Sequence, residues 1–304
     1  MDMLDHYNAE GYVIVPDLIP HARIDRLVDC LERFKQGRRP YWSESIHTWM
    51  SPKLDEKGFL VQSMENFTRL WFSQGLNDAG KDILLGSEIR DVMRVVSPGN
   101  DEFVHWLNHL FDRSTGSIDH IDSWYLDSDP PGKLIGAWIA LEDIHPDSGP
   151  FRLFPRSHLL PGLDELWTLD HDAFIKRCAE LIKPLEPMHA LIKKGTVVFF
   201  TPFILHGAVD QKDSRYSRKS VTGHYLPFGQ VRRERVAQPE PLDVRRAREI
   251  AMARKVGNRP IAVTHSMRDE ILFNVRGVAS WGKAMVTGRP SLGMDMRRKS
   301  YADL

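Results

Sequence analysis

The middle of this chain consists of short apolar and aromatic runs, and each run ends at Gly, Pro, Asp or Ser. Runs of this length and composition are typical of β-strands, and the breaks between them are typical of turns. The run at 134–141 is apolar on both faces, which indicates a strand covered on both sides. Many short strands in succession predict a β-barrel or a two-sheet jelly roll. The predicted strands are residues 102–111, 133–144, 151–154, 196–201 and 218–227.

Helical patterns flank this strand-rich region. Ile24, Leu27 and Leu31 recur at the helical period, and charged side chains occupy the opposite face. The predicted fold class is therefore mainly β, with flanking helices around a jelly-roll core. Three further segments are predicted to be helical, at 68–89, 163–183 and 241–256, and one further strand is predicted at 92–96, before a Ser-Pro-Gly turn.

The composition changes near Gly229, where we place a boundary. Residues 1–229 are predicted to form the β domain with its N-terminal helices. In residues 230–304 basic side chains outnumber acidic ones by about two to one. We expect this basic segment to be partly helical and to pack on, or cap, the same domain. The alternatives are a lid over an anionic substrate and an interface with another protein.

Charge and cysteine content exclude several classes of protein. The 41 basic and 41 acidic side chains cancel, which argues against a nucleic-acid binder or a protein bound to an anionic membrane. Two cysteines without a Cys-x-x-Cys pair exclude zinc fingers and iron–sulfur sites and favour a cytoplasmic location. The acidic start lacks the apolar run of a signal peptide, and nothing later resembles a membrane span. We expect a monomer or a homodimer.

A His-x-Asp pair and a distant histidine form the first chemical pattern. On a strand, His120 and Asp122 would project to the same face, and His206 ends an apolar strand. Two histidines and one carboxylate make the facial triad of non-haem Fe(II) oxygenases, which leaves coordination positions open. Each part is weak alone, since His-x-Asp is common and a histidine on an apolar strand usually belongs to the core.

Arg218 and Ser220 form the second pattern, about a dozen residues after His206. Because they are two residues apart on a predicted strand, they share a face. A guanidinium fork and a hydroxyl are suited to holding a carboxylate, such as that of 2-oxoglutarate, whose other end would chelate iron. The order of the triad followed by Arg-x-Ser is much more specific than either pattern alone.

The order of these motifs along the chain matches that of a known enzyme family. The sequence resembles the phytanoyl-CoA dioxygenase family of Fe(II)- and 2-oxoglutarate-dependent oxygenases over about residues 5–228. The resemblance implies a double-stranded β-helix of the cupin-like, jelly-roll type. It also implies His120, Asp122 and His206 as the iron ligands, Arg218 as the anchor of 2-oxoglutarate, and O2 as the other co-substrate. The matching blocks are residues 7–16, 120–122, 138–143, 148–158, 194–200, 206–207 and Arg218.

Several positions refine or depart from the family pattern. Related halogenases have Gly or Ala where this chain has Asp122, so the carboxylate favours hydroxylation over halogenation. The family usually has Pro-Gly-Ser-His where this chain has Arg156, which would place a cation beside the entrance. Asn108 and Trp138 are candidate contacts of the co-substrate, and His224 shares the strand face of Arg218.

The predicted function is therefore an Fe(II)- and 2-oxoglutarate-dependent dioxygenase that hydroxylates an unactivated C–H bond and releases succinate and CO2. The basic C-terminal segment and Arg156 favour a small, anionic substrate, and the divergent cap favours secondary or specialised metabolism. Desaturation, cyclisation and epoxidation stay open. The alternatives are a metal-binding β-helix protein without oxygenase activity, such as an isomerase or a ligand sensor, and an interaction protein built on a degenerate barrel.

Overall fold

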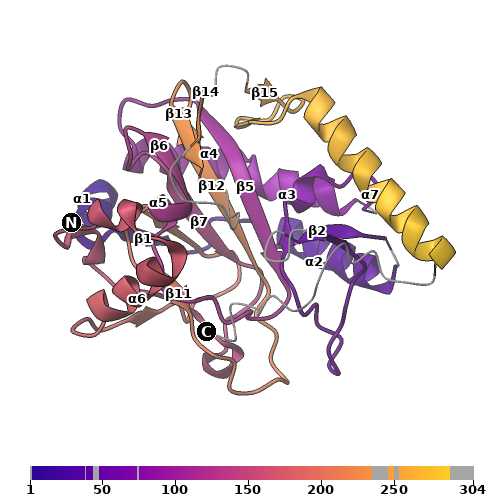
Figure 1. Cartoon of the computed structure of the whole chain (residues 1–304), viewed down its shortest axis with the longest axis horizontal. Coiled ribbons are helices and arrows are strands. Elements are labelled where there is room, and N and C mark those ends of the chain that lie inside the picture. The colour runs from indigo at the N-terminus through magenta and orange to yellow at the C-terminus, as the bar shows by residue number, and fades with distance from the viewer. Residues whose placement is uncertain are drawn as a thin grey trace.

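A large mixed sheet forms the centre of the computed structural model, which describes residues 2–37, 39–43, 48–73, 75–234, 246–249 and 253–287 (Figure 1). Its strand order is β1-β10-β7-β12-β5-β16-β15, and β4 also pairs with β5. Its strands are β1 (Tyr12–Val15), β4 (Met64–Glu65), β5 (Phe103–Phe111), β7 (Ile135–Ala140), β10 (Val197–Phe200), β12 (Ser220–Pro227), β15 (Arg254–Lys255) and β16 (Ala262–Val263).

A second, smaller sheet has the order β11-β8-β9, with β8 at Phe151–Leu153, β9 at Met188–His189 and β11 at His206–Ala208. A buried cluster that includes Trp138, Phe151, Phe200 and Ile204 joins side chains of the two sheets. The two-sheet arrangement is of the predicted jelly-roll type. Two minor sheets pair β2 (Tyr41–Ser43) with β3 (Thr48–Met50), and β6 (Leu126–Asp129) with β13 (Val231–Glu234) and β14 (Arg246–Glu249).

Helices α2, α3 and α7 lie on one side of the large sheet, and α5 and α6 lie on the other side (Figure 1). Successive side chains of a strand point to opposite faces of the sheet, so both faces can be covered. In β10, Val197 and Phe199 face the helices, and Val198 and Phe200 face the second sheet. Helices take a larger share of the chain than the predicted mainly-β class implies. They are α1 (Met3–Glu10), α2 (His21–Gln36), α3 (Leu76–Leu84), α4 (Ser87–Val96), α5 (Asp122–Tyr125), α6 (His171–Leu181) and α7 (Met267–Thr287).

The strand predicted at 92–96 is wrong, because these residues form the second half of α4. Val92, Met93 and Val96 are buried at helical spacing, and a short apolar run does not by itself distinguish a strand from a buried helix. The single helix predicted at 68–89 is instead divided. Gly75 and Gly86 precede α3 and α4 and interrupt the helical backbone.

The helix predicted at 241–256 is also wrong where the structure describes it. Residues 246–249 are β14, which pairs with β13, and residues 254–255 are β15. Here the hydrogen-bonding edge of β13 outweighs the helical propensity of an Arg-rich and Ala-rich segment. Residues 253 and 256 are in neither a helix nor a strand, and residues 241–245 and 250–252 lie outside the described ranges. In the described part of the C-terminal segment the helix is α7, and the boundary near residue 229 stays a prediction.

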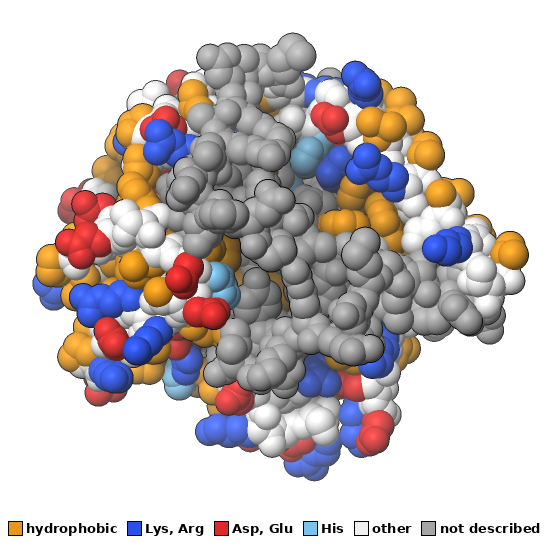
Figure 2. Space-filling view, in the orientation of Figure 1, with side chains coloured by type: hydrophobic (Ala, Val, Ile, Leu, Met, Phe, Trp, Pro, Cys, Tyr) orange, Lys and Arg blue, Asp and Glu red, His pale blue; other side chains and the backbone are white. Residues whose placement is uncertain are grey.

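The long helix α7 packs on the domain by one face only. Asn274 and Gly277 are buried, and Gly277 lies against the ring of Trp49. On the opposite face Ile271 and Val275 are exposed, and Figure 2 shows apolar side chains along this edge of the molecule. None of the helices in the described ranges combines the length and the apolar character needed to cross a membrane.

His105 on β5 gives an expected pH dependence of stability. The side chain is buried, its Nε2 has no hydrogen-bond partner, and burial lowers its pKa to about 3. The unfolded chain therefore binds a proton below about pH 6.5 that the folded chain does not bind, so stability falls as the pH drops.

When the pH is lowered from 7.5 to 5.5, we expect the free energy of unfolding of His105→Phe to fall by about 1 kcal/mol less than that of the wild type. Urea unfolding at the two pH values measures this difference. His189→Phe, at an exposed position on β9, is the control and should keep the wild-type dependence. Equal losses in His105→Phe and the wild type would contradict the assignment.

Candidate metal centre

Two histidines from distant parts of the chain are held side by side by their own backbones. His120 and His206 form an antiparallel bridge, with N–O distances of 2.9 and 3.0 Å in the two directions. Side chains of directly opposed residues lie on the same face, and the two ring centroids are 4.5 Å apart. His206 is also the first residue of β11, which β8 anchors through Leu153.

Asp122 completes the predicted triad by a different route from the one expected. It does not share a strand with His120, because the chain turns after Ile121 and Asp122 begins the short helix α5. Its Oδ1 lies 3.5 Å from Nε2 of His120 and 3.4 Å from Nε2 of His206. The three ligand atoms lie within 4.8 Å of one another, which is a suitable arrangement for a single metal ion.

The hydrogen bonds of the histidines leave the correct nitrogens free for a metal. Nδ1 of His120 lies 2.7 Å from the carbonyl oxygen of Ile118, and Nδ1 of His206 lies 3.0 Å from that of Ile204. Because a carbonyl oxygen only accepts, both Nδ1 atoms carry the proton and both Nε2 atoms offer a lone pair. This donor set fits Fe(II), with two imidazole nitrogens and one carboxylate oxygen.

The charge of Asp122 is secured by its surroundings. Burial alone would raise the pKa of this carboxyl, but His206, His224 and His120 outweigh burial and hold the pKa well below its usual range. Nε2 of His224 lies 3.0 Å from Oδ2 of Asp122 and donates to it. One carboxylate oxygen is thereby occupied, and the other, Oδ1, faces the two histidines.

Arg218 is a buried cation that forms no ion pair with any residue the structure describes. Only 2% of it is exposed, and its Nη1 donates to Oγ of Ser220 at 2.9 Å. Its Nε has no partner, and in the described part of the chain no carboxylate forms an ion pair with it. Burial lowers its pKa to about 10, so it stays charged at neutral pH. An unpaired buried charge is costly, and an anionic ligand would remove that cost.

Trp138 and Phe111 form the walls around Arg218. Their ring centroids lie 5.8 and 4.9 Å from the guanidinium carbon. Trp138 also stacks on Phe151 of the second sheet, so its side chain lies between the two sheets, on the face of Arg218 and Ser220. The predicted candidates Trp138 and Ser220 are thus brought together with Arg218.

Asn108 lies on the other face of β5. Its amide donates to Oγ1 of Thr68 at 2.9 Å, in the helical layer. The neighbouring His109 faces the centre instead, with its ring 6.0 Å from that of His224, and burial lowers the pKa of His109 to about 3. In the pairing of β5 with β12, Asn108 lies opposite Gly223 and His109 lies opposite Thr222, so His109, and not Asn108, is on the face of Ser220 and His224.

His224 is the residue whose role the sequence did not indicate. It shares the face of β12 with Ser220, as expected, but it contacts Asp122 rather than the anchor of the co-substrate. Arg156, expected beside an entrance, lies at a turn where its backbone N–H donates to the carbonyl of Glu10 at the end of α1. Its φ of 66° is left-handed, which explains why glycine suits this position.

A bidentate contact supports the segment that carries His120. Arg152 on β8 donates to both carboxylate oxygens of Asp119, at 2.8 and 2.6 Å. Gly207 lies so close that a Cβ there would be 2.5 Å from Asp119. The absence of a side chain after His206 therefore lets the two ligand-bearing segments pair closely.

Comparison with known proteins agrees with this geometry. The family model described as phytanoyl-CoA dioxygenase matches residues 7–220, which include all three triad residues and Arg218. The chain belongs to the phytanoyl-CoA dioxygenase family. Peroxisomal phytanoyl-CoA dioxygenases of Bos taurus and Homo sapiens are 27% and 26% identical over 109 residues. This match covers 35% of the chain, and the chain spans only about a third (32%) of the length of these relatives.

Solved structures show the same fold at low identity. The chain is similar to the non-haem α-ketoglutarate-dependent epimerase SnoN of nogalamycin biosynthesis, with a TM-score of 0.55 and 15% identity over 86% of this chain and 96% of that one. It is also similar to EctD from S. alaskensis with 2-oxoglutarate and 5-hydroxyectoine, with a TM-score of 0.55 and 16% identity over 86% and 88% of the chains. The predicted family is confirmed, and the solved structures agree with the predicted fold.

Removing the imidazole of His224 is expected to weaken metal binding. Without its N–H, Oδ2 of Asp122 loses its donor and the carboxylate can rotate. We expect His224→Phe to lower metal affinity about 10- to 100-fold, the usual effect of losing an outer partner of a ligand. Anaerobic calorimetric titration with Mn(II) measures it, His189→Phe is the matched control, and an unchanged affinity would show that Asp122 needs no such support.

Proposed function

We propose that this chain is an Fe(II)- and 2-oxoglutarate-dependent dioxygenase that oxidises, and most simply hydroxylates, an unactivated C–H bond of a small molecule. The observation that carries the proposal is the buried Arg218, which forms no ion pair with a described residue and lies on the same inner face as a complete His-Asp-His triad. A metal-binding β-helix protein without oxygenase activity, such as an isomerase or a sensor, has no need of that cation.

The residues of the chain have distinct tasks in this proposal. Nε2 of His120, Oδ1 of Asp122 and Nε2 of His206 would hold the iron, and Arg218 with Ser220 would bind the distal carboxylate of 2-oxoglutarate. When both are bound, the chemistry supplied is C–H oxidation coupled to the conversion of 2-oxoglutarate to succinate and CO2.

The rings around the triad limit the access of water. Phe200 and Phe151 have their ring centroids 4.9 and 5.5 Å from that of His206, and Tyr125 lies 5.5 Å from His120. An apolar wall of this kind strengthens electrostatic contacts at the site, because the local dielectric constant is lower than that of water. His120 is the most exposed of the three triad side chains, so we propose that the substrate approaches from its side.

The substrate class is proposed more coarsely. We propose a small organic molecule of secondary or specialised metabolism, and an anionic group on it would suit the basic C-terminal segment. Cytoplasmic location, the monomeric or dimeric state and the choice among hydroxylation, desaturation, cyclisation and epoxidation stay predictions.

The test is a spectrum followed by a turnover assay. Under anaerobic conditions, Fe(II) and 2-oxoglutarate together should give a weak visible charge-transfer band that neither gives alone. A screen of small metabolites in air should then find compounds that stimulate succinate formation. A fully metal-loaded protein that shows no band would refute the oxygenase proposal and favour the sensor or isomerase alternative.

A further inference from the structure

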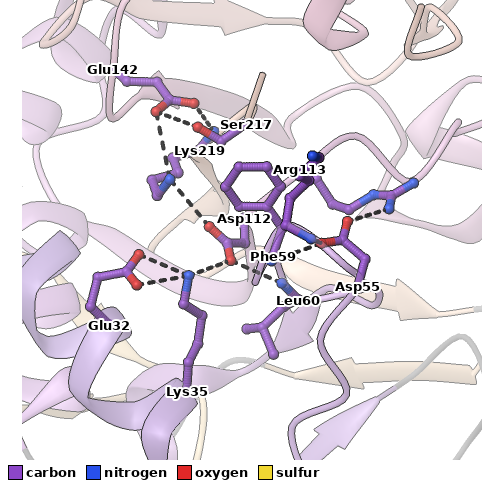
Figure 3. Close-up of polar contacts among 11 residues, drawn as sticks. Glu32, Lys35, Asp55, Phe59, Leu60, Asp112, Arg113, Glu142, Ser217 and Lys219 are labelled. Carbon is purple, nitrogen blue, oxygen red and sulfur yellow. Dashed lines mark hydrogen bonds and ion pairs between the residues drawn. The ribbon is translucent and has the colours of Figure 1, made fainter. Parts of the chain in front are cut away.

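A buried charged network lies behind the strand that begins after Arg218 (Figure 3). Its centre is Asp112, whose side chain is fully buried. Oδ2 of Asp112 accepts from Nζ of Lys35 and from the backbone N–H of Leu60, both at 2.9 Å. Oδ1 lies 3.4 Å from Nζ of Lys219. We call Asp112, Lys35 and Lys219 the Asp112 network; it joins α2 to the residue that follows β5 and to the residue that precedes β12.

Both neighbours of Arg218 are held from outside the metal centre. Glu142 accepts from the backbone N–H of Lys219 at 2.7 Å and from Oγ of Ser217 at 2.8 Å. The backbone N–H of Arg218 itself donates to the carbonyl oxygen of Asp112 at 3.1 Å. The position of the Arg218 Cα is therefore set by two carboxylate-bearing residues, Asp112 and Glu142, neither of which contacts its guanidinium.

Lys35 is the most distant member of the network. It projects from α2, only 6% of its side chain is exposed, and it also pairs with Glu32 at 2.8 Å. Burial alone would lower its pKa, but the ion pairs with Glu32 and Asp112 outweigh burial and raise it, so the ammonium stays charged. The ring of Phe59 lies 5.8 Å from Lys35 and 5.1 Å from Lys219, so both ammonium groups lie near one aromatic side chain.

The energetics of such a network favour a geometric role. A buried ion pair stabilises a fold little more than an apolar replacement of similar size, because desolvation offsets most of the attraction. Its distances and directions are nevertheless strict, since a misplaced charge stays uncompensated. What the network supplies at this place is thus a fixed position for the start of β12.

We propose that the Asp112 network is a positioning device for Arg218, which sets how far the guanidinium lies from the metal and thereby the chain length of the dicarboxylate that fits between them. Lys35 acts in it as a positioning residue that never touches the co-substrate. The inference rests on the proposed function and deepens it, because it assigns co-substrate selectivity to helix α2.

The test compares two 2-oxo diacids that differ by one carbon. The full-length protein and its Lys35→Met variant, which keeps the aliphatic stem without the charge, are loaded anaerobically with Fe(II). Each is titrated with 2-oxoglutarate and with 2-oxoadipate, and the charge-transfer band gives both dissociation constants. We expect 2-oxoglutarate to bind about 10- to 100-fold more weakly to the variant, as for a small displacement of a positioning group. The preference for 2-oxoglutarate over 2-oxoadipate should shrink, while Mn(II) affinity should stay within about twofold, a change too small to indicate a lost interaction.

Matched variants separate positioning from a general loss of structure. Lys193→Met breaks an exposed ion pair with Asp143 and should leave all three affinities unchanged. Asp112→Asn is nearly isosteric and should reproduce the effect of Lys35→Met, and Lys35→Arg should restore part of the preference for 2-oxoglutarate. Circular dichroism and thermal unfolding check that each variant is folded.

Two negative results have different meanings. If the folded variants Lys35→Met and Asp112→Asn keep the wild-type ratio of the two dissociation constants, the positioning role is overturned and the proposed function stands. If the wild-type protein with Fe(II) binds neither diacid, the proposed function fails and the positioning role fails with it. If Lys35→Met does not fold, Asp112→Asn and Lys35→Arg decide the question.

Discussion

Asp122→Ala is expected to lose metal affinity by more than the roughly 100-fold that the loss of an outer partner costs, because a direct ligand is removed. The loss has a second cause. Without the carboxylate, His120 and His206 bring two imidazoles together with no negative charge between them, and the donor of His224 loses its acceptor. Substrate-dependent succinate formation should fall below detection.

Calorimetry with Mn(II) and an assay of succinate measure this result independently. Asp143→Ala is the matched control, because this carboxylate is exposed and forms a surface ion pair with Lys193. Asp122→Asn separates charge from shape, since the amide keeps an oxygen near the histidines but no negative charge. Wild-type metal affinity in Asp122→Ala would mean that the triad is not the metal site.

Arg218→Ala is expected to leave the metal site intact and to remove most binding of 2-oxoglutarate. Truncating one partner of a buried charge pair costs about 2–5 kcal/mol, which corresponds to roughly 30- to several-thousand-fold in affinity. The effect should appear in the dissociation constant of 2-oxoglutarate, read from the charge-transfer band, while Mn(II) binding changes little. Arg218→Lys should rescue only part of the loss, because an ammonium lacks the planar fork of the guanidinium.

The control for Arg218 lies close by in the sequence. Arg215 is exposed and pairs with Asp213, so Arg215→Ala changes the same net charge without reaching the site. Equal binding of 2-oxoglutarate by Arg218→Ala and Arg215→Ala would show that another residue anchors the co-substrate. Thermal unfolding is the necessary check, since the guanidinium also lies against Phe111 and Trp138.

Most of the centre could be predicted from the sequence because its parts are local. His120 and Asp122 are two residues apart, and Arg218 and Ser220 share a strand face by simple alternation. The strands of the jelly roll could be predicted for the same reason, since each is a short apolar run with a clear end. The prediction that Asp122 shares a strand with His120 was wrong, because a turn into α5 brings Asp122 to the histidines.

What could not be predicted depends on contacts between distant segments. The contact of His224 with Asp122 spans 102 positions, and that of Lys35 with Asp112 spans 77. Contacts between residues so far apart leave no periodic pattern in the sequence. Asn108 was chosen from the resemblance to the family, and the pairing of β5 with β12 places it opposite Gly223, on the face away from Ser220 and His224. The residues predicted as a strand at 92–96 form a helix instead, because Val92, Met93 and Val96 are buried at helical spacing in α4.

The backbone bridge between His120 and His206 has a consequence for work on the apoprotein. Two of the three ligands are joined through main-chain hydrogen bonds that do not involve the ion, so chelation should not separate them. The emptied centre should therefore accept a different ion without refolding. Exchange with Co(II) or Ni(II) would then provide stable spectroscopic reporters of substrate binding that work in air, where Fe(II) would be consumed.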